Sequence, residues 1–264
     1  MKSIYCLFMS IILILMVTPK VYAPVGSPIT IKILYDNYVS NEELKTDWGF
    51  SCVIEGTEKT VLFDAGTKGD ILFHNIKKLK VNLEEVELVA ISHHHGDHFG
   101  GLFSFLKENN EVTVYLPVSF PDEFFRRVEK NEAKAIAVDK PVEMCKDAFL
   151  TGEMGDRIKE QSLILNTAQG LVVITGCAHP GILRIVKRAK EIIDKKIYQV
   201  CGGFHLLDKS EAEIKEIINQ FKDLGVMKVG ATHCTGDRAI ELFKEAYGKN
   251  FVQMGVGRVI KIAD

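Results

Sequence analysis

The chain has 264 residues, of which 47% are hydrophobic and 26% are charged. This length and composition indicate an ordered globular protein with one large domain, or at most two small ones, and exclude a disordered chain. The formal net charge is -2 and the sequence contains no basic block, so nucleic acid is not an expected partner.

The first 23 residues have the character of an export signal, because a basic start leads into an apolar run over 4–17 and then to Ala23. Pro24 argues against cleavage after Ala23, so an uncleaved membrane anchor is the alternative, although the run is shorter than a full span of ~20 residues. We therefore expect an exported protein, periplasmic or extracellular, or one tethered to the membrane by this segment. Residues 24–264 would form the folded domain.

The first half of that domain alternates β-rich runs with helical spacing. We predict strands over 29–35, 49–55 and 60–64, a helix over 69–80, a strand over 86–91, a short helix over 101–107 and a strand over 112–116. A helix is predicted over 122–132. The remainder of 121–160 is charged and irregular, which predicts a flap or inserted loop that acts as a lid or a subunit contact.

The second half returns to a regular pattern. We predict strands over 163–166 and 171–175, a helix over 182–193, a strand over 197–200, a helix from Ser210 to about 224, a strand over 227–231, a helix over 237–247 and a strand over 258–262. Glu213 lies three residues after Ser210, which is typical of a capping box. Each half begins with hairpin-like strands and continues with strand–helix units, which predicts a four-layer αββα sandwich.

Seven of the eight histidines lie at the ends of predicted strands, and His74, inside a predicted helix, is the exception. Four fall in one window directly after the strand 86–91, namely His93-His94-His95-Gly96-Asp97-His98. The others, His179, His205 and His233, each follow a separate strand. A surface histidine tract is the alternative explanation, but it does not account for histidines repeated at so many strand ends.

This pattern indicates a metal centre, because neutral imidazole and carboxylate bind zinc and similar divalent ions. Alternate residues of an extended segment face the same way, so His93 and His95 can bind one ion together while His94 points away. Gly96 would permit a tight turn that brings Asp97 and His98 to a neighbouring position. Two ions roughly 3.5–4 Å apart could then share a hydroxide.

The six cysteines are irregularly spaced and include no Cys-x-x-Cys pair, so they do not indicate a disulfide framework. Each is expected to be a small buried hydrophobic residue. Cys177, Cys201 and Cys234 stand out because each lies beside a histidine motif.

The string His93-x-His95-x-Asp97-His98 resembles the signature of the metallo-β-lactamase superfamily, and Asp64 in Leu62-Phe63-Asp64-Ala65-Gly66 resembles its early aspartate. This resemblance covers nearly all of residues 29–264. Shorter motifs resemble the subgroup named for dihydropterin–ribofuranosylaminobenzene phosphate synthase. They are Asp36-Asn37, Trp48-Gly49-Phe50-Ser51, Gly176-Cys177-Ala178-His179-Pro180-Gly181, Gly202-Gly203-Phe204-His205-Leu206 and His233-Cys234-Thr235-Gly236.

The resemblance implies a binuclear centre with two sets of ligands: His93, His95 and His179 for one ion, and Asp97, His98 and His233 for the other. Many members of the superfamily bridge the ions with an aspartate after the third motif, but residues 201–205 contain no acid. His205 could therefore be a ligand, contact substrate or act as a general acid, and Cys201 is a weaker candidate. Zinc is the first choice of metal, with manganese, iron and magnesium as alternatives.

As a hydrolase, such a centre would deliver a metal-activated hydroxide to a small molecule, with Asp97 orienting the nucleophile and His205 protonating the leaving group. Asp64 would orient a ligand or loop from behind, or simply form a turn before Gly66. Thr235 and Gly236 precede a predicted helix whose free amides would suit a phosphorylated substrate, and ordinary helix capping is the alternative.

Two other functions stay open. The subgroup's name implies a transferase that joins a pterin pyrophosphate to an aminobenzene ribotide, although an exported protein would rarely meet those cytoplasmic intermediates. The second alternative is a metal-bound sensor or binding module without turnover. The oligomeric state is not indicated by the sequence.

Overall fold

The structure of the protein is a computed structural model that describes residues 28–263. The predicted export signal or anchor over 1–23 lies outside the described residues. Within them, every helix is too short or too polar to cross a lipid bilayer.

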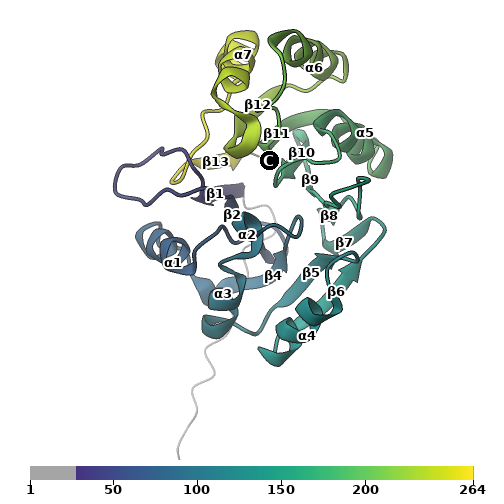
Figure 1. Ribbon diagram of the computed structural model, residues 1–264. Helices are drawn as coiled ribbons and strands as arrows, with labels where there is room; N and C mark the ends of the chain where they lie inside the picture. Colours follow the sequence, from purple (N-terminus) through teal and green to yellow (C-terminus); the bar gives the residue numbers. More distant parts are fainter. Residues whose placement is uncertain (1–27, 264) are drawn as a thin grey trace, which may run out of the picture.

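Two β-sheets form the centre of the molecule (Figure 1). The first has seven strands in the order β13 (Val259–Ile262), β1 (Ile29–Tyr35), β2 (Ser51–Glu55), β3 (Thr60–Phe63), β4 (Val86–Ala90), β5 (Thr113–Pro117) and β6 (Lys134–Val138). The second has six in the order β12 (Lys228–Thr232), β11 (Ile197–Gly203), β10 (Gly170–Thr175), β9 (Leu163–Thr167), β8 (Ala148–Leu150) and β7 (Val142–Cys145).

Helices cover the outer face of each sheet, as Figure 1 shows. Those on the first sheet are α1 (Gly69–Lys78), α3 (Leu102–Glu108) and α4 (Asp122–Lys130), and those on the second are α5 (Ile182–Ile192), α6 (Glu211–Asp223) and α7 (Asp237–Tyr247). The described residues also contain a four-residue helix, α2 (Gly96–Phe99), and three 3-10 turns, η1 (Leu83–Glu85), η2 (His233–Thr235) and η3 (Gly248–Asn250). The predicted four-layer αββα sandwich is therefore confirmed.

Three apolar cores hold the layers together. The central core lies between the sheets and contains side chains such as Ile33 and Leu88 from the first sheet and Val172 from the second. The two outer cores bury one face of each helix against its sheet, with Leu72 in the first and Phe221 in the second. Full burial of each such side chain contributes roughly 1.5–3 kcal/mol, so each amphipathic helix is stabilised mainly by the sheet beneath it.

Both sheets change from antiparallel to parallel pairing along their width. β1, β2 and β3 are antiparallel neighbours, whereas β3, β4, β5 and β6 run parallel. In the second sheet, β9 and β10 are antiparallel, whereas β10, β11 and β12 run parallel. The carboxyl ends of the parallel strands are the places where α/β sheets usually present their functional loops.

The prediction of an irregular loop after the helix in 121–160 is wrong, because the segment forms three strands, β6, β7 and β8. β6 and β7 each lie at one edge of their sheet, and β8 has three residues. Edge strands are exposed on one side and often carry charges, so their sequences lack a clear alternation of apolar and polar residues.

The strand predicted over 197–200 continues to Gly203. Gly202 has φ +116°, and a Cβ at this position would lie 2.1 Å from the carbonyl oxygen of Thr175 on the neighbouring strand. Only glycine fits this close approach, although glycine weakens the strand signal in the sequence.

Candidate metal centre

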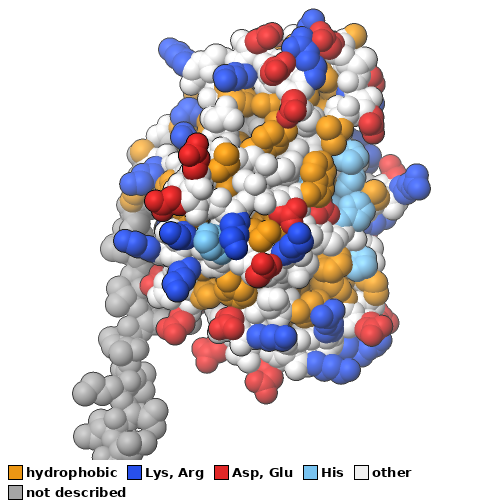
Figure 2. All heavy atoms as spheres, turned by 60° about the vertical axis from the view of Figure 1, so that its left-hand side comes forward, with side chains coloured by type: hydrophobic (Ala, Val, Ile, Leu, Met, Phe, Trp, Pro, Cys, Tyr) orange, Lys and Arg blue, Asp and Glu red, His pale blue; other side chains and the backbone are white. Residues whose placement is uncertain are grey.

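The histidines gather at the end of the sandwich where β4, β10, β11 and β12 terminate. His93 follows β4, and the short helix α2 then carries Asp97 and His98. His179 follows β10 and His233 follows β12. Figure 2 shows histidine side chains along one edge of the molecule, next to hydrophobic side chains. Residues that are far apart in the sequence therefore meet in one place.

One cluster consists of His93, His95 and His179, whose ligand atoms all lie within 4.8 Å of one another. His93 Nε2 is 3.0 Å from His95 Nδ1, and the His179 ring centroid lies 4.7 Å from that of His93. His93 is buried, and the other two side chains are partly exposed. These are the three residues predicted to share one ion.

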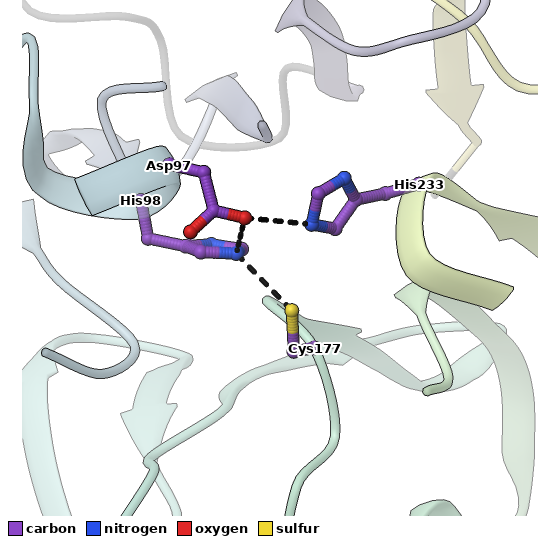
Figure 3. Close-up of side chains that lie close together, drawn as sticks. All are labelled: Asp97, His98, Cys177 and His233. Atoms are coloured by element: carbon purple, nitrogen blue, oxygen red, sulfur yellow. Dashed lines mark hydrogen bonds and ion pairs between the residues drawn. The ribbon is translucent and has the colours of Figure 1, made fainter. Parts of the chain in front are cut away.

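A second cluster consists of Asp97, His98 and His233, joined by Cys177 (Figure 3). Asp97 Oδ2 lies 3.4 Å from His98 Nε2 and 3.4 Å from His233 Nε2. The predicted ligands of the other ion are therefore also brought together. Gly96 does not make the expected tight turn, because it has no positive φ and instead begins α2.

The spacing of these atoms fits a metal ion. Tetrahedral zinc with bonds of ~2.0–2.2 Å to nitrogen and oxygen places two ligand atoms about 3.4 Å apart. The Asp97 contacts have this separation. Moreover, His179 Nε2 and His233 Nε2 are buried without a hydrogen-bond partner, a cost that a bound cation would remove.

The protonation of the rings also suits metal binding. Burial lowers the pKa of His179 to about 3 and that of His93 well below its usual value, so both rings are neutral at pH 7. Burial also lowers the pKa of His98, but the Asp64 carboxylate outweighs this effect and raises it to about 10. A cation bound to His98 Nε2 would displace the proton favoured there, so binding would release protons.

Asp64 lies next to the clustered side chains, a position that suits the orienting role predicted for it. Its Oδ2 atom accepts a hydrogen bond from His98 Nδ1 at 2.7 Å, and its carboxylate also accepts from the backbone and the hydroxyl of Ser92. The Ser92 hydroxyl lies 2.9 Å from His93 Nδ1. One buried carboxylate thus orients a ring in each cluster, which is a role beyond that of a turn residue.

Asn37 orients His233, a role that the sequence analysis did not assign. Asn37 Oδ1 lies 2.8 Å from His233 Nδ1, and the Asn37 amide donates to the His233 carbonyl at 3.2 Å. This leaves His233 Nε2 facing the second cluster. Only the Asp36-Asn37 motif in the sequence marked this residue, with no indication of its function.

Glu160 is a second residue that the sequence analysis missed. Its buried carboxylate accepts backbone hydrogen bonds from Cys177, Ala178 and His179 at 3.1, 2.8 and 2.8 Å. Burial raises its pKa to about 7, although these hydrogen bonds act in the opposite direction. Glu160 therefore fixes the loop that carries His179. A lone glutamate in a segment expected to be irregular gives no signal of this role.

The remaining predicted residues lie at the border of the clusters. His205 is exposed, with its ring centroid 4.3 Å from that of His179, and a hydrogen bond with the Cys234 thiol raises its pKa. The Thr235 hydroxyl is buried and bonded to the Thr232 carbonyl and the Phe204 amide, so this side chain holds the loop. Gly236 is the N-cap of α7. Substrate contact by Thr235 and Gly236 stays a prediction.

Two histidines lie outside the clusters, as expected. His94 stacks on Phe99 with ring centroids 5.0 Å apart and contributes to neither cluster. His74 lies in α1, with Nε2 3.3 Å from the Glu43 carbonyl oxygen. The sequence pattern thus separated the clustered histidines from those with local roles.

Backbone strain is concentrated around the clusters. Seven described non-glycine residues have positive φ, and four of them adjoin the clusters: Asp64, Ala178, His205 and His233. Such conformations cost of order 1–3 kcal/mol each and persist only where the surroundings impose them. The strained positions indicate that the fold holds these loops in place for a purpose other than stability.

Fold and site together define a sandwich protein with clustered metal-binding side chains at its strand ends. Residues 49–180 match the family model described as the metallo-beta-lactamase superfamily. The chain belongs to this superfamily, as its sequence motifs predicted.

Individual relatives agree with this assignment. The chain is 30% identical to a 7,8-dihydropterin-6-methyl-4-(beta-D-ribofuranosyl)-aminobenzene-5'-phosphate synthase of Methanocaldococcus jannaschii, over 90% of this chain and 98% of the relative. It resembles the structure of a metal-dependent hydrolase of the beta-lactamase superfamily with a TM-score of 0.75 and 30% identity, over 89% of this chain and 100% of that one. Human tRNase Z, short form, has a TM-score of 0.61 and 16% identity over 89% and 100%, a likeness of fold alone.

Proposed function

We propose that the chain is a metal-dependent hydrolase with a binuclear centre that acts on a small molecule. Two groups of side chains would hold the ions: His93, His95 and His179 in the first, and Asp97, His98 and His233 in the second. Zinc suits these donors, with manganese, iron and magnesium as alternatives. Bound ions of this kind supply a Lewis acid and a nucleophile at neutral pH.

The observation that carries this proposal is a pair of buried ring nitrogens that make no hydrogen bond, His179 Nε2 and His233 Nε2, one in each cluster. A buried polar atom without a partner costs about 1–3 kcal/mol. A fold that keeps one such nitrogen in each of two ligand clusters is expected to offer them to metal ions. Two clusters support two ions.

Residues of the chain itself would position and protonate the reactants. Asp97 is partly exposed and lies between His98 and His233, so its carboxylate can orient a nucleophile. His205 is exposed beside His179, where its ring can donate a proton to a leaving group. The start of α7, capped by Gly236, supplies backbone amides for a phosphorylated substrate.

Trp48 supports a substrate that contains a flat ring. Its side chain is 47% exposed, and its ring centroid lies 4.9 Å from that of His233. A large apolar side chain exposed beside a polar cluster is a suitable stacking surface for an aromatic group. We therefore propose that Trp48 contacts the organic part of the substrate.

A second candidate function is transfer of a dihydropterin group from its pyrophosphate to an aminobenzene ribotide. It is favoured by the similarity to the synthase of Methanocaldococcus jannaschii, which extends over 98% of that protein. Hydrolysis and transfer differ in the acceptor, water or an aromatic amine. In both reactions the same metal centre would stabilise the leaving group.

The test is a substrate screen with the purified protein in the presence of zinc or manganese. Phosphomonoesters, phosphodiesters, lactones and a pterin pyrophosphate would be offered with and without an aminobenzene acceptor. We expect turnover that His95→Ala abolishes and that His74→Ala leaves unchanged, since His74 lies in α1 outside both clusters.

The products distinguish the alternatives. Product formed without the acceptor supports the hydrolase, and product that requires the acceptor supports the transferase. Tight ligand binding without turnover would support a sensor instead. Failure of the wild-type protein to bind metal under any condition would contradict all three.

We also propose that the protein is exported or tethered through residues 1–23, which would restrict its substrates to molecules outside the cytoplasm. N-terminal sequencing of the mature protein checks this proposal. A chain that starts at Met1 in a soluble cytoplasmic fraction would contradict it.

A further inference from the structure

We propose that the Cys177 thiolate is a ligand of the second ion, together with Asp97, His98 and His233. The proposal rests on the proposed metal centre and adds a sulfur donor to it. Binding would release the thiol proton as the sulfur–metal bond forms.

The first support is geometric. Cys177 Sγ lies 3.2 Å from His98 Nε2, and the four ligand atoms of this cluster are all within 4.8 Å of one another (Figure 3). Zinc bonds of ~2.3 Å to sulfur and ~2.0 Å to nitrogen at a tetrahedral angle place these atoms about 3.5 Å apart. A small outward movement of either side chain would therefore admit the ion.

The second support is the surroundings of Cys177, compared with those of three of the four other described cysteines. Cys52, Cys145 and Cys201 belong to the apolar core between the sheets, as small buried hydrophobic residues should. Cys177 is only 4% exposed, but imidazoles and a carboxylate line its cluster. Packing does not explain a thiol at this position.

A third support comes from the carboxylates near the site, which are committed to other partners. Asp64 binds Ser92 and His98. The carboxylate of Glu160 accepts three backbone amides. Of the acids in the described part of the chain, only Asp97 belongs to a ligand cluster. The second ion would thus have one carboxylate and two imidazoles, and the thiolate supplies a fourth donor.

The loop that carries Cys177 holds the thiol in place. The backbone amide of Cys177 donates a hydrogen bond to the Glu160 carboxylate at 3.1 Å, and the Cys177 carbonyl accepts one from the Cys234 thiol at 3.6 Å. The neighbouring His233 is 1% exposed, and its Nε2 atom makes no hydrogen bond and lies 3.4 Å from Asp97 Oδ2 of the same cluster. A preformed thiol and a free imidazole nitrogen therefore point at one location.

Two consequences follow for the centre. A thiolate favours zinc, cobalt or iron over magnesium and manganese at the second site. Four protein ligands also complete a tetrahedral shell there, whereas the three histidines of the first site leave a position open. The open position would be the one that meets substrate.

Cobalt substitution of the full-length protein provides the test, because a thiolate bound to Co²⁺ gives an intense charge-transfer absorption in the near ultraviolet. We expect two cobalt ions and this absorption in the wild type. Cys177→Ser should abolish the absorption and lower the affinity for one of the two ions by at least about tenfold. Cys145→Ser, in the apolar core, is the matched control and should retain both. Cys177→Asp should restore the second ion without the absorption.

Several outcomes would overturn the proposal. Two bound ions without the absorption in the wild type would exclude a thiolate ligand while leaving the binuclear centre intact. A third group of possible ligand atoms, from Cys177, His205 and Cys234, also lies within 4.8 Å of one another. Absorption that survives Cys177→Ser and disappears in Cys234→Ser would assign the sulfur ligand to Cys234 in this third group. If Cys177→Ser does not fold, as judged by circular dichroism, Cys177→Asp decides: unchanged absorption would refute the proposal.

Discussion

At the scale of single residues, two imidazoles of the second cluster are oriented through the nitrogen that faces away from the cluster. His98 Nδ1 is bound to Asp64, and His233 Nδ1 is bound to Asn37. An acceptor on Nδ1 fixes the tautomer and leaves Nε2 as the free ligand atom. The positions of the rings are therefore set by the protein before any ion arrives.

Asp64→Asn should weaken metal binding, because an amide holds the proton of His98 less well than a carboxylate does. We expect a loss of 10- to 100-fold in affinity, as is common when a residue that orients a metal ligand is changed. Competition with a chromophoric chelator measures it. Asp70→Asn, an exposed residue in the first turn of α1, should have no effect, and equal affinity in both variants would contradict the orienting role.

Trp48→Ala should raise KM for the substrate by up to about tenfold and leave the metal content unchanged, because stacking contributes about 0.5–1.5 kcal/mol. Trp48→Phe should restore most of the affinity. Met227→Ala is a suitable control, because this exposed side chain lies at the opposite end of β12 from His233. Steady-state kinetics checks the prediction, and a change in kcat with KM constant would count against a binding role.

At the scale of elements, strand ends are predictable from the sequence and contacts between loops are not. The apolar run over 86–91 stops just before His93, and the histidine that follows marks the functional end of the strand. Edge strands such as β6 and β7 lack this contrast. The contact between Cys177 and His98 joins residues 79 positions apart, and no local pattern records such a separation.

Glu160→Gln should loosen the loop that carries His179, because an amide oxygen cannot replace two carboxylate oxygens as acceptors for three backbone amides. A buried amide left without an acceptor costs about 1–3 kcal/mol. We expect the free energy of unfolding, measured by denaturant titration, to fall by this amount. We also expect weaker metal binding at the first site, which contains His179. Glu143→Gln, exposed on β7, is the control. Unchanged metal affinity would show that Glu160 serves stability alone.

The N-terminus of α6 should be destabilised by Ser210→Ala, because the predicted capping box with Glu213 is present. Loss of such a cap costs about 1 kcal/mol, with no expected change in metal content. Denaturant titration measures it, with Ser40→Ala as the exposed control. An effect on metal affinity would contradict a purely local role.

The Glu213 half of this capping box should depend on pH. The ion pair with Lys209, followed by hydrogen bonds from Ser210, lowers the pKa of Glu213 from 4.5 to about 2. A depressed pKa contributes stability above the unfolded value and loses it as the pH falls through the folded value. The difference in Tm between the wild type and Glu213→Gln should therefore shrink between pH 4.5 and about 2. A constant difference would contradict the assignment.

At the scale of the whole molecule, each cluster joins the two halves of the sandwich. His93 and His98 follow β4 of the first sheet, whereas His179 and His233 follow strands of the second. An ion in either cluster would therefore tie the sheets together. The alternation of strands and helices in the sequence predicted the two halves of the sandwich. The contacts between side chains of different halves were not predictable, because they depend on how the two sheets pack against each other.

Removal of metal by a chelator should lower Tm reversibly, because an ion that binds only the folded state stabilises it. The gain is about 2.7 kcal/mol per site when the free ion is a hundredfold above its Kd. Scanning calorimetry before and after addition of zinc measures the shift. His95→Ala should reduce it and His94→Ala should not, since His94 belongs to neither cluster. A Tm independent of metal would argue against a tie between the sheets.

The last strand of the chain lies beside the first, since β13 pairs with β1 from Ile29–Ile262 to Lys32–Val259. During synthesis β1 must therefore wait, with one hydrogen-bonding edge open, until β13 has left the ribosome. Closure of the first sheet is a late event that depends on a contact of maximal sequence separation. Truncation of only the final few residues should thus expose that edge to self-association, even though every residue of the metal centre is still present.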